Sequence, residues 1–283
     1  MLKHYESELK ALHDFDTFVE PFFGGGAMTI HIYENFKDVK RFVINDIKPE
    51  IIRIYESIKS DCDRFLELMD EYDSHFMPMS KERRKEYYYE VRLKHAYEYE
   101  SMTPTEEAAC LYFLLRTCFN GVWQINQNTN GRFGTPSGLL DQKVSIYEKS
   151  NVKEWNAFLQ NADLHTGDWK EVSKKYEDEK AFFFFDPPYR DSFTSYGGEF
   201  NDTAQEELVF FCNGLVDKGS QAFLTNRDSG DGFFDSRITK EMSIKRVNVV
   251  YTAGRRKKVE NGFEAKPAVE VLIHTPLKEN KIF

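Results

Sequence analysis

The segment that most constrains the fold is FFFFDPPY, at residues 182–189. A short, fully apolar run predicts a buried strand, and this run ends directly at the Asp186 carboxylate. The two prolines that follow fix φ and remove N–H donors, so we expect a rigid set of acceptors at the carboxyl end of the strand. Such a set suits a planar substrate with an exocyclic amino group, because the amino hydrogens can bond to the acceptors while Tyr189 stacks on the ring. The alternative is an ordinary Pro-Pro turn after a strand.

A glycine-rich segment lies far upstream, FVEPFFGGGA at residues 18–27. It predicts a strand that leads into a tight turn and then a helix from Ala27 to Tyr33. Glycines let a ligand approach the backbone closely, and the helix N-terminus behind them favours negative charge. The segment matches neither G-x-G-x-x-G nor a P-loop, so a phosphate cradle is not indicated. A plain tight turn is the alternative.

A second predicted strand, RFVIND at residues 41–46, ends in an acidic residue about 20 positions further on. A carboxylate at this place can hold the two hydroxyls of a ribose. A helix cap before Ile47 would be the simpler role for Asp46. Because the two segments have the spacing of a nucleoside site, we favour the ribose role.

The charge pattern singles out residues 110–140. The chain has a net charge of −9, yet this stretch contains no Asp or Glu, where the average acid content would give roughly five. It keeps Arg116 and Arg132, and such a surface suits phosphates and base edges. The turn-forming residues 128–131 predict a β-hairpin, which would present Phe119, Asn120 and Gln124 to a groove. The alternative is a buried helix followed by a polar loop.

The order of the predicted elements indicates an α/β fold. Strand-forming segments occur before residue 47 and again after residue 161, separated by helical patterns, which implies a sheet with helices on both faces. Ligands bind at the carboxyl ends of strands in such sheets. We therefore expect a catalytic domain made of residues 1–52 and 158–283, with an inserted, mostly helical domain at residues 53–157 that carries the hairpin.

Several classes of protein are disfavoured by composition. No apolar stretch approaches the ~20 residues of a membrane helix, and the first residues lack the apolar core of a signal peptide. The four cysteines form no C-x-x-C pair and the seven histidines are scattered, which gives no metal-ligand spacing. We expect a cytoplasmic protein that binds neither a membrane nor a metal.

Taken together and in order, these motifs resemble the Dam-like (D12 class, alpha group) DNA adenine-N6 methyltransferases. The resemblance extends over roughly residues 16–275. It includes a similarity to the DNA-contacting hairpin of the family, to a late N-R-D turn and to a basic loop, at residues 119–138, 226–228 and 254–258. The resemblance implies a Rossmann-like catalytic domain, S-adenosylmethionine as cofactor and double-stranded DNA as partner, with a restriction endonuclease as a candidate second partner.

The resemblance also implies roles for particular residues. The catalytic set would be Asp186, Pro187, Pro188 and Tyr189. The cofactor would be bound by Glu20, Pro21, Phe22, Phe23, Gly24, Gly25, Gly26, Asp46, Asp168 and Asp186. For Asp168, a helix cap and a bond to the adenine amino group of the cofactor are equally good roles. DNA would be contacted by Arg116, Phe119, Asn120, Val122, Gln124, Asn126, Arg132, Pro136, Arg255, Arg256 and Lys257.

Two features depart from the family pattern. Family members usually carry a short P/A-G-G-K segment before the first strand, and residues 1–14 contain none. Members that act on GATC place an Arg at the position of Gln124, and Gln complements adenine N6 and N7 where Arg complements guanine. GATC specificity is therefore not carried over, and we expect Gln124 to read an A·T pair or to make only a degenerate contact where a GATC enzyme reads G·C. A non-catalytic DNA-binding homologue, or a methyltransferase for RNA or a protein amide, remains as an alternative.

Overall fold

The computed structural model describes residues 2–190, 200–250, 257–259, 262–264 and 267–276. They form two compact units, which we describe separately. One unit comprises Met1–Ile47, Gly167–Phe193 and Phe200–Phe283, and the other comprises Lys48–Thr166 together with a short segment outside the described residues.

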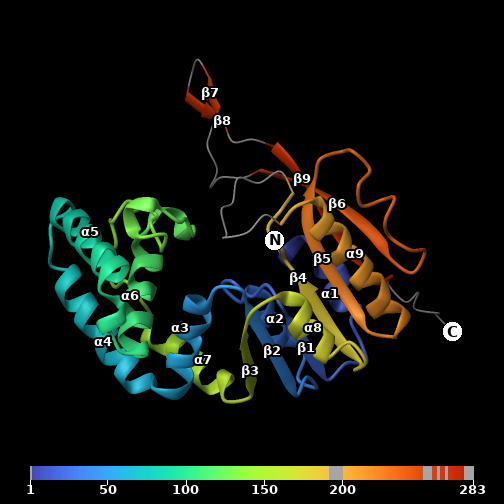
Figure 1. Ribbon diagram of the computed structural model, residues 1–283, viewed down its shortest axis with the longest axis horizontal. Coiled ribbons are helices and arrows are strands. Elements are labelled where there is room, and N and C mark those ends of the chain that lie inside the picture. The colour runs from blue at the N-terminus through green and yellow to red at the C-terminus, as the bar shows by residue number, and fades with distance from the viewer. Residues whose placement is uncertain (1, 191–199, 251–256, 260–261, 265–266, 277–283) are drawn as a thin grey trace. The chain divides into compact units, whose positions relative to one another are not determined.

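The chain is organised around a seven-stranded sheet with the order β3-β2-β1-β4-β5-β9-β6 (Figure 1). Strands β2, β1, β4 and β5 run parallel to one another, whereas β9 is antiparallel to both β5 and β6. The strand order reverses between β1 and β4, which is where open α/β sheets bind ligands. The strands are β1 Thr17–Glu20, β2 Arg41–Asp46, β3 Ala162–Thr166, β4 Ala181–Phe185, β5 Gln221–Asp228, β6 Ser243–Val250 and β9 Pro267–His274. A separate pair is formed by β7 Lys257–Val259 and β8 Gly262–Glu264.

The predicted apolar strand is confirmed, because all five residues of β4 are buried. Successive side chains of β4 point alternately to the two faces of the sheet. Phe183 and Phe185 belong to a core with apolar residues of α8 and α9, and α9 lies along β5 (Figure 1). Phe182 points the other way and packs against Phe18 and Phe223, with ring centroids 5.4 and 5.0 Å apart. The helices of this unit are α1 Glu6–Lys10, α2 Ala27–Asn35, α8 Trp169–Lys175 and α9 Asp202–Asp217, after a short 3-10 turn η1 at Leu2–His4.

The second unit is helical up to β3 at its end. The sequence TPTE at residues 103–106 predicts the start of a helix, and the most buried helix of the unit, α6, begins there. Thr103 and Glu106 form a capping box, with a proline at the first helical position. Helix α6 packs against α3, α4 and α5, and the Phe113 ring on α6 contacts aromatic rings of α4 and α5. The helices are α3 Pro49–Ser60, α4 Cys62–Phe76, α5 Lys81–Tyr97, α6 Pro104–Thr117 and α7 Lys149–Leu159, with 3-10 turns η2 Tyr99–Ser101, η3 Phe119–Gly121 and η4 Gln127–Thr129.

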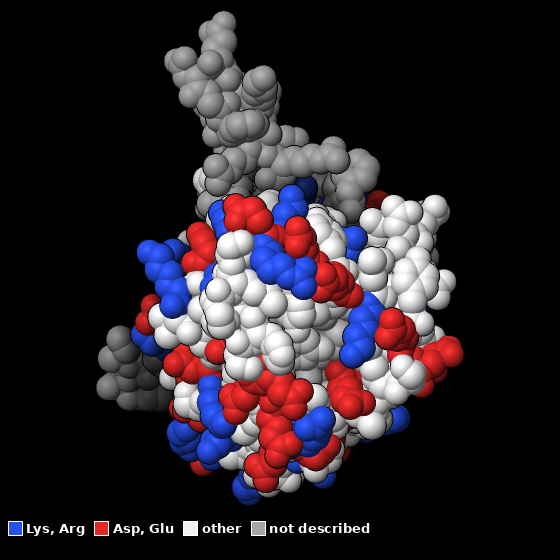
Figure 2. Space-filling view, turned by 90° about the vertical axis from the view of Figure 1, so that its left-hand side faces the viewer, with Lys and Arg blue, Asp and Glu red and all other residues white. Residues whose placement is uncertain are grey.

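Figure 2 shows acidic and basic side chains intermingled on the side of this unit that carries α4 and α5. Several are paired with each other, as in Arg83 with Glu90 at 2.7 Å and Arg64 with Glu67 at 3.0 Å. Such pairs leave little net field to attract a polyanion. Among the residues that the structure describes, no helix is long and apolar enough to cross a membrane.

Candidate functional site

Glu20, at the end of β1, is bonded to helix α2, which follows the glycine turn. This side chain is buried and accepts hydrogen bonds from the backbone N–H (3.0 Å) and the hydroxyl of Thr29 on α2. Burial raises the pKa of Glu20 to about 8, and the negative charge of Asp186 adds to the rise, while the bonds from Thr29 oppose it. The predicted cofactor residue Glu20 therefore joins the two elements on either side of the turn, β1 and α2.

The turn itself has the backbone that glycines permit. Gly24 and Gly26 have φ of 52° and 67°, in the left-handed region that other residues rarely occupy. A Cβ atom placed on Gly24 or Gly25 would meet nothing within 4 Å. Gly24 and Gly25 are exposed, whereas Pro21 and Phe23, which precede them, are buried and Phe22 is half-buried. The turn therefore presents bare backbone to the space above it.

The end of β2 reaches the same turn. The backbone N–H of Gly24 donates to Oδ2 of Asp46 at 3.0 Å, so the predicted ribose acceptor lies beside the predicted cofactor turn. The preceding Asn45 is fully buried, and its Nδ2 donates to the carbonyls of Pro21 (2.9 Å) and Gly167 (3.0 Å). Sequence reasoning missed this role of Asn45, which fastens the turn after β1 to the turn before α8.

Asp168 takes the simpler of its two predicted roles in this structure. It is the N-cap of α8, and its Oδ1 accepts from the backbone N–H of Lys170 at 2.8 Å. The residue is exposed. A bond from Asp168 to the cofactor remains a prediction.

The end of β4 places Asp186 against β5. Oδ1 of Asp186 accepts from the Thr225 hydroxyl at 2.6 Å. Burial raises the pKa of Asp186, and the charge of Glu270 adds to the rise, while hydrogen bonds from Thr225 and Tyr189 oppose it. The aromatic side chain of the motif is therefore bonded to its carboxylate. Thr225 is a further residue that sequence reasoning missed.

The predicted hairpin is a reversal of the chain without a regular strand ladder. Only two isolated antiparallel bridges, Cys118 with Ser137 and Ile125 with Phe133, join its arms in the described part of the chain. Asn130 and Gly131, with φ of 52° and 72°, turn the chain back. The chain therefore reverses direction where the β-hairpin was predicted, but the two arms do not form the predicted strands.

Several predicted DNA contacts lie on the outside of this loop. Phe119 is 47% exposed, a high value for a large aromatic residue, and Asn120, Gln124 and Pro136 are also exposed. The backbone beneath them is held in place: the Phe119 N–H donates to the Pro136 carbonyl (2.9 Å), and the Gln124 N–H donates to the Thr135 hydroxyl (3.0 Å). Val122 is half-buried next to them.

Other predicted contacts are engaged inside the unit. Arg132 is only 14% exposed, forms an ion pair with the buried Glu107 and stacks on Tyr99 with its Cζ 3.5 Å from the ring centroid. Glu107 also pairs with Arg53 on α3. The Asn126 side chain accepts from the Asn128 N–H at 2.9 Å and caps η4.

The remaining Arg and Lys residues predicted to contact DNA lie partly within and partly outside the described residues. Arg116 is exposed on α6 and its Nε donates to the Ile146 carbonyl at 3.0 Å. Lys257 begins β7, while Arg255 and Arg256 lie outside the described residues. No group of three or more His, Cys, Asp or Glu side chains suited to a metal ion occurs among the residues described.

Comparison with known proteins places the chain in a family. Residues 2–253 match the model of the D12 class N6 adenine-specific DNA methyltransferases, and the chain belongs to this family. It is 31% identical over 236 residues to the Type II methyltransferase M.MjaIII of Methanocaldococcus jannaschii, covering 81% of this chain and 79% of that protein.

Other relatives agree. The Type II methyltransferase M.CviBI of Paramecium bursaria Chlorella virus NC1A is 30% identical over 252 residues, with 86% and 87% of the two chains covered. The DNA adenine methylase of Escherichia coli K12 is 25% identical over 260 residues, with 90% and 84% covered. The family assignment, the methyltransferase class of enzyme and the Rossmann-like fold that the sequence predicted are confirmed.

Proposed function

We propose that this chain transfers a methyl group from S-adenosylmethionine to N6 of an adenine that is extruded from double-stranded DNA. One arrangement carries the proposal: the Asp186 carboxylate at the end of β4, beside the exposed glycine turn of β1 and the Asp46 carboxylate of β2. These groups lie at the carboxyl ends of adjacent strands, at the point where the strand order reverses.

The turn and Asp46 fit the cofactor. The open space above Gly24 and Gly25 lets a ligand lie directly on the backbone, and Asp46 at the same turn supplies an acceptor for ribose hydroxyls. When bound, S-adenosylmethionine supplies an electrophilic methyl group on a sulfonium. The buried Glu20 and Asn45 hold the turn in shape, and Asp168 is a candidate contact at the end of β3.

The motif at residues 186–189 fits the adenine. N6 of a paired adenine is enclosed in the stack, so the base must leave the duplex. Asp186 and the Pro187 carbonyl would accept bonds from the N6 amino group, which orients its lone pair and stabilises the positive charge that develops on nitrogen. Tyr189 would stack on the base, and Pro188 keeps the segment stiff. A strong base is not required, because the amine can lose its proton after transfer.

We propose that the helical unit recognises the target through the loop at residues 118–137. Phe119 would wedge into the stack, Asn120 would contact the orphaned base, and Gln124 would contact a base edge, supported by Val122 and Pro136. We no longer include Arg132 and Asn126 among the proposed DNA contacts, because their side chains bond within the helical unit. Arg116 and the basic segment at 255–257 would contact phosphates. A cytoplasmic location and a restriction endonuclease partner remain predictions.

Two measurements test the proposal. Calorimetric titration with S-adenosylmethionine should show binding that Asp46→Ala weakens, and the absence of binding by the wild type would favour a non-catalytic DNA-binding homologue. Single-molecule sequencing of DNA exposed to the protein and cofactor should reveal N6-methyladenine at one defined sequence. Methylation of RNA or protein in its place would refute the choice of substrate.

Base extrusion is tested separately. A duplex with 2-aminopurine at the target position should brighten on binding, and Phe119→Ala should reduce the gain. Because Tyr189 could quench the probe, affinity for duplexes with a mismatched target should be measured in parallel, and it should exceed affinity for matched duplexes. Equal affinities would count against extrusion.

A further inference from the structure

We propose that two buried amides, Gln205 and Asn226, fix the direction of the Tyr189 side chain and are therefore positioning residues for methyl transfer. This inference rests on the proposed function, which gives Tyr189 its role at the base. Neither amide faces solvent: Gln205 on α9 and Asn226 on β5 are both 0% exposed.

The two amides hold the peptide groups on either side of Tyr189. Nε2 of Gln205 donates to the carbonyl of Pro188 at 2.8 Å, and Oδ1 of Asn226 accepts from the backbone N–H of Arg190 at 3.0 Å. Each peptide group is planar, so fixing both planes fixes φ and ψ of the residue between them. The direction of the Cα–Cβ bond of Tyr189 follows from these two angles.

The two amides are also bonded to each other in a single consistent direction. Oδ1 of Asn226 faces two donors, the N–H groups of Arg190 and Arg227 (2.8 Å). Nδ2 of Asn226 then donates to Oε1 of Gln205 at 2.9 Å, which leaves Nε2 of Gln205 to donate to Pro188. Because each step determines the next, replacing either amide by a group without an N–H donor breaks the chain of bonds that reaches Pro188.

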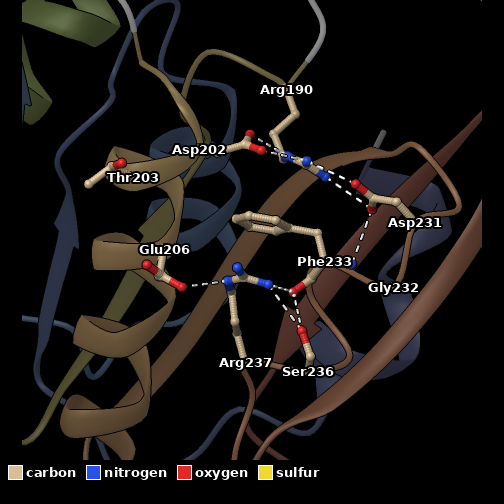
Figure 3. A pocket seen from close by; sticks show the side chains of 9 residues that line it. All are labelled: Arg190, Asp202, Thr203, Glu206, Asp231, Gly232, Phe233, Ser236 and Arg237. Atoms are coloured by element: carbon tan, nitrogen blue, oxygen red, sulfur yellow. Dashed lines mark hydrogen bonds and ion pairs between the residues drawn. The ribbon is translucent and has the colours of Figure 1, made fainter.

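The Arg190 side chain holds the same segment from outside (Figure 3). It is 7% exposed and forms ion pairs with Asp202 at 2.8 Å and Asp231 at 3.0 Å, and its Cζ lies 3.8 Å from the centroid of the Phe233 ring. Asp202 begins α9, the helix of Gln205, and Asp231 follows β5, the strand of Asn226. The backbone on either side of Tyr189 and the Arg190 side chain are thus both bonded to α9 and to the chain in and after β5. A shift of residues 188–190 would have to break these bonds or move both elements.

The test uses Gln205→Met, which keeps the size of the side chain and removes its amide. Single-turnover methylation of an adenine-containing duplex should slow by about 10- to 100-fold, the scale for a misplaced reacting group. The dissociation constant for S-adenosylmethionine should stay within about twofold, because the glycine turn and Asp46 are not touched. Gln205→Leu, which also removes the amide, should show the same separation of rate from cofactor affinity.

A matched control lies on the same helix. Asn213 is also a buried amide of α9, 7% exposed, and its Nδ2 donates to the Arg237 carbonyl at 2.9 Å. Asn213→Ala should lower the thermal midpoint as Gln205→Met does and leave the transfer rate unchanged. A rate loss in Asn213→Ala equal to that in Gln205→Met would show that the effect is one of general stability.

A double-mutant cycle decides the mechanism. In a Tyr189→Ala background, Gln205→Met should add little further loss, because the side chain that it positions is gone. Full additivity of the two losses would overturn the inference. A wild type without methyltransferase activity, or a Tyr189→Ala variant with normal turnover, would instead refute the proposed function or the role of Tyr189, and either result is distinguishable from additivity.

Discussion

Asp186→Ala should abolish most methyl transfer and leave the fold in place. The change removes the main acceptor for the N6 amino group, and loss of one positioned electrostatic group costs about 10²- to 10³-fold in rate, or about 2.7–4 kcal/mol. The Thr225 hydroxyl keeps a partner, since it also lies 3.3 Å from the Phe185 carbonyl. Burial raises the pKa of Asp186, so the surroundings do not favour its charged form, and its removal should change the unfolding free energy by no more than about 1 kcal/mol.

The graded variant Thr225→Val tests the same idea more finely. It leaves the carboxylate and removes one hydrogen bond that favours its ionised form, so the pKa of Asp186 should rise further. If the ionised carboxylate is the active form, the acidic limb of the pH–rate profile should move to higher pH, with the plateau rate reduced less than in Asp186→Ala.

The assay is single-turnover transfer of a labelled methyl group to an adenine-containing duplex, with circular dichroism and calorimetric binding of S-adenosylmethionine as controls. Near-normal turnover by folded, cofactor-binding Asp186→Ala protein would refute the reasoning. An unmoved acidic limb in Thr225→Val would show that another group titrates.

Further outcomes follow from other parts of the molecule. Glu107→Ala leaves two arginines without their buried partner and should lower the unfolding free energy in urea by about 3 kcal/mol; a change below about 1 kcal/mol would mean that solvent replaces the pairs. Gln124→Arg should shift the methylated site toward guanine at one position, with about 1–3 kcal/mol of discrimination, and sequencing of the modified DNA would show an unchanged site if another residue reads that base. Gly24→Ala should weaken S-adenosylmethionine binding in calorimetry, whereas Gly219→Ala, with a similar positive φ of 89° away from the turn, should leave it unchanged; equal effects would point to strain alone. The folded pKa of Glu20, about 8, lies above its ordinary 4.5, so its stabilising contribution is full below about pH 4.5 and is lost as the pH rises to 8; urea titrations of Glu20→Gln should lack this fall, and a parallel decline in both proteins would assign it elsewhere.

The sequence predicted those parts of the fold that depend on local pattern. Four consecutive phenylalanines predicted a buried strand, and β4 is one. The start of α6 followed from Thr103 and Glu106, whose side chains and backbone bond to each other within one turn. The order of acidic strand ends likewise predicted that Asp46 would lie at the glycine turn.

What the sequence could not show depends on pairing between distant segments. Thr225 reaches Asp186 because Phe185 pairs with Leu224 between β4 and β5, and no sequence pattern gives that register. Arg132 falls in a stretch without acids, but its partner Glu107 comes from just outside that stretch. Neither contact has a local signal.

The missing strand ladder of the hairpin has a local cause. The Thr135 hydroxyl donates to the Val122 carbonyl at 2.7 Å, and the Thr129 hydroxyl donates to the carbonyls of Asn126 (2.8 Å) and Arg132 (2.9 Å). Side-chain hydroxyls thus compete for backbone carbonyls along the loop, and the Arg132 carbonyl accepts from the Asn126 N–H only at 3.4 Å. The turn-forming residues that predicted the hairpin carry no information on this competition.

The position of the helical unit in the chain also has a consequence for the rate of folding. Thr17 pairs with Ala181 at the centre of the sheet, and this pairing closes a loop of about 160 residues. The ends of the helical unit are tied together, since Lys59 donates to the Ala162 carbonyl at 2.7 Å and Asn156 to the Ile58 carbonyl at 2.6 Å. If this unit folds first, the loop shortens to about 60 residues and the entropic cost of closing it falls by about 1 kcal/mol. We therefore expect mutations that loosen α3 against α7 to slow closure of the sheet, although they change none of its strands.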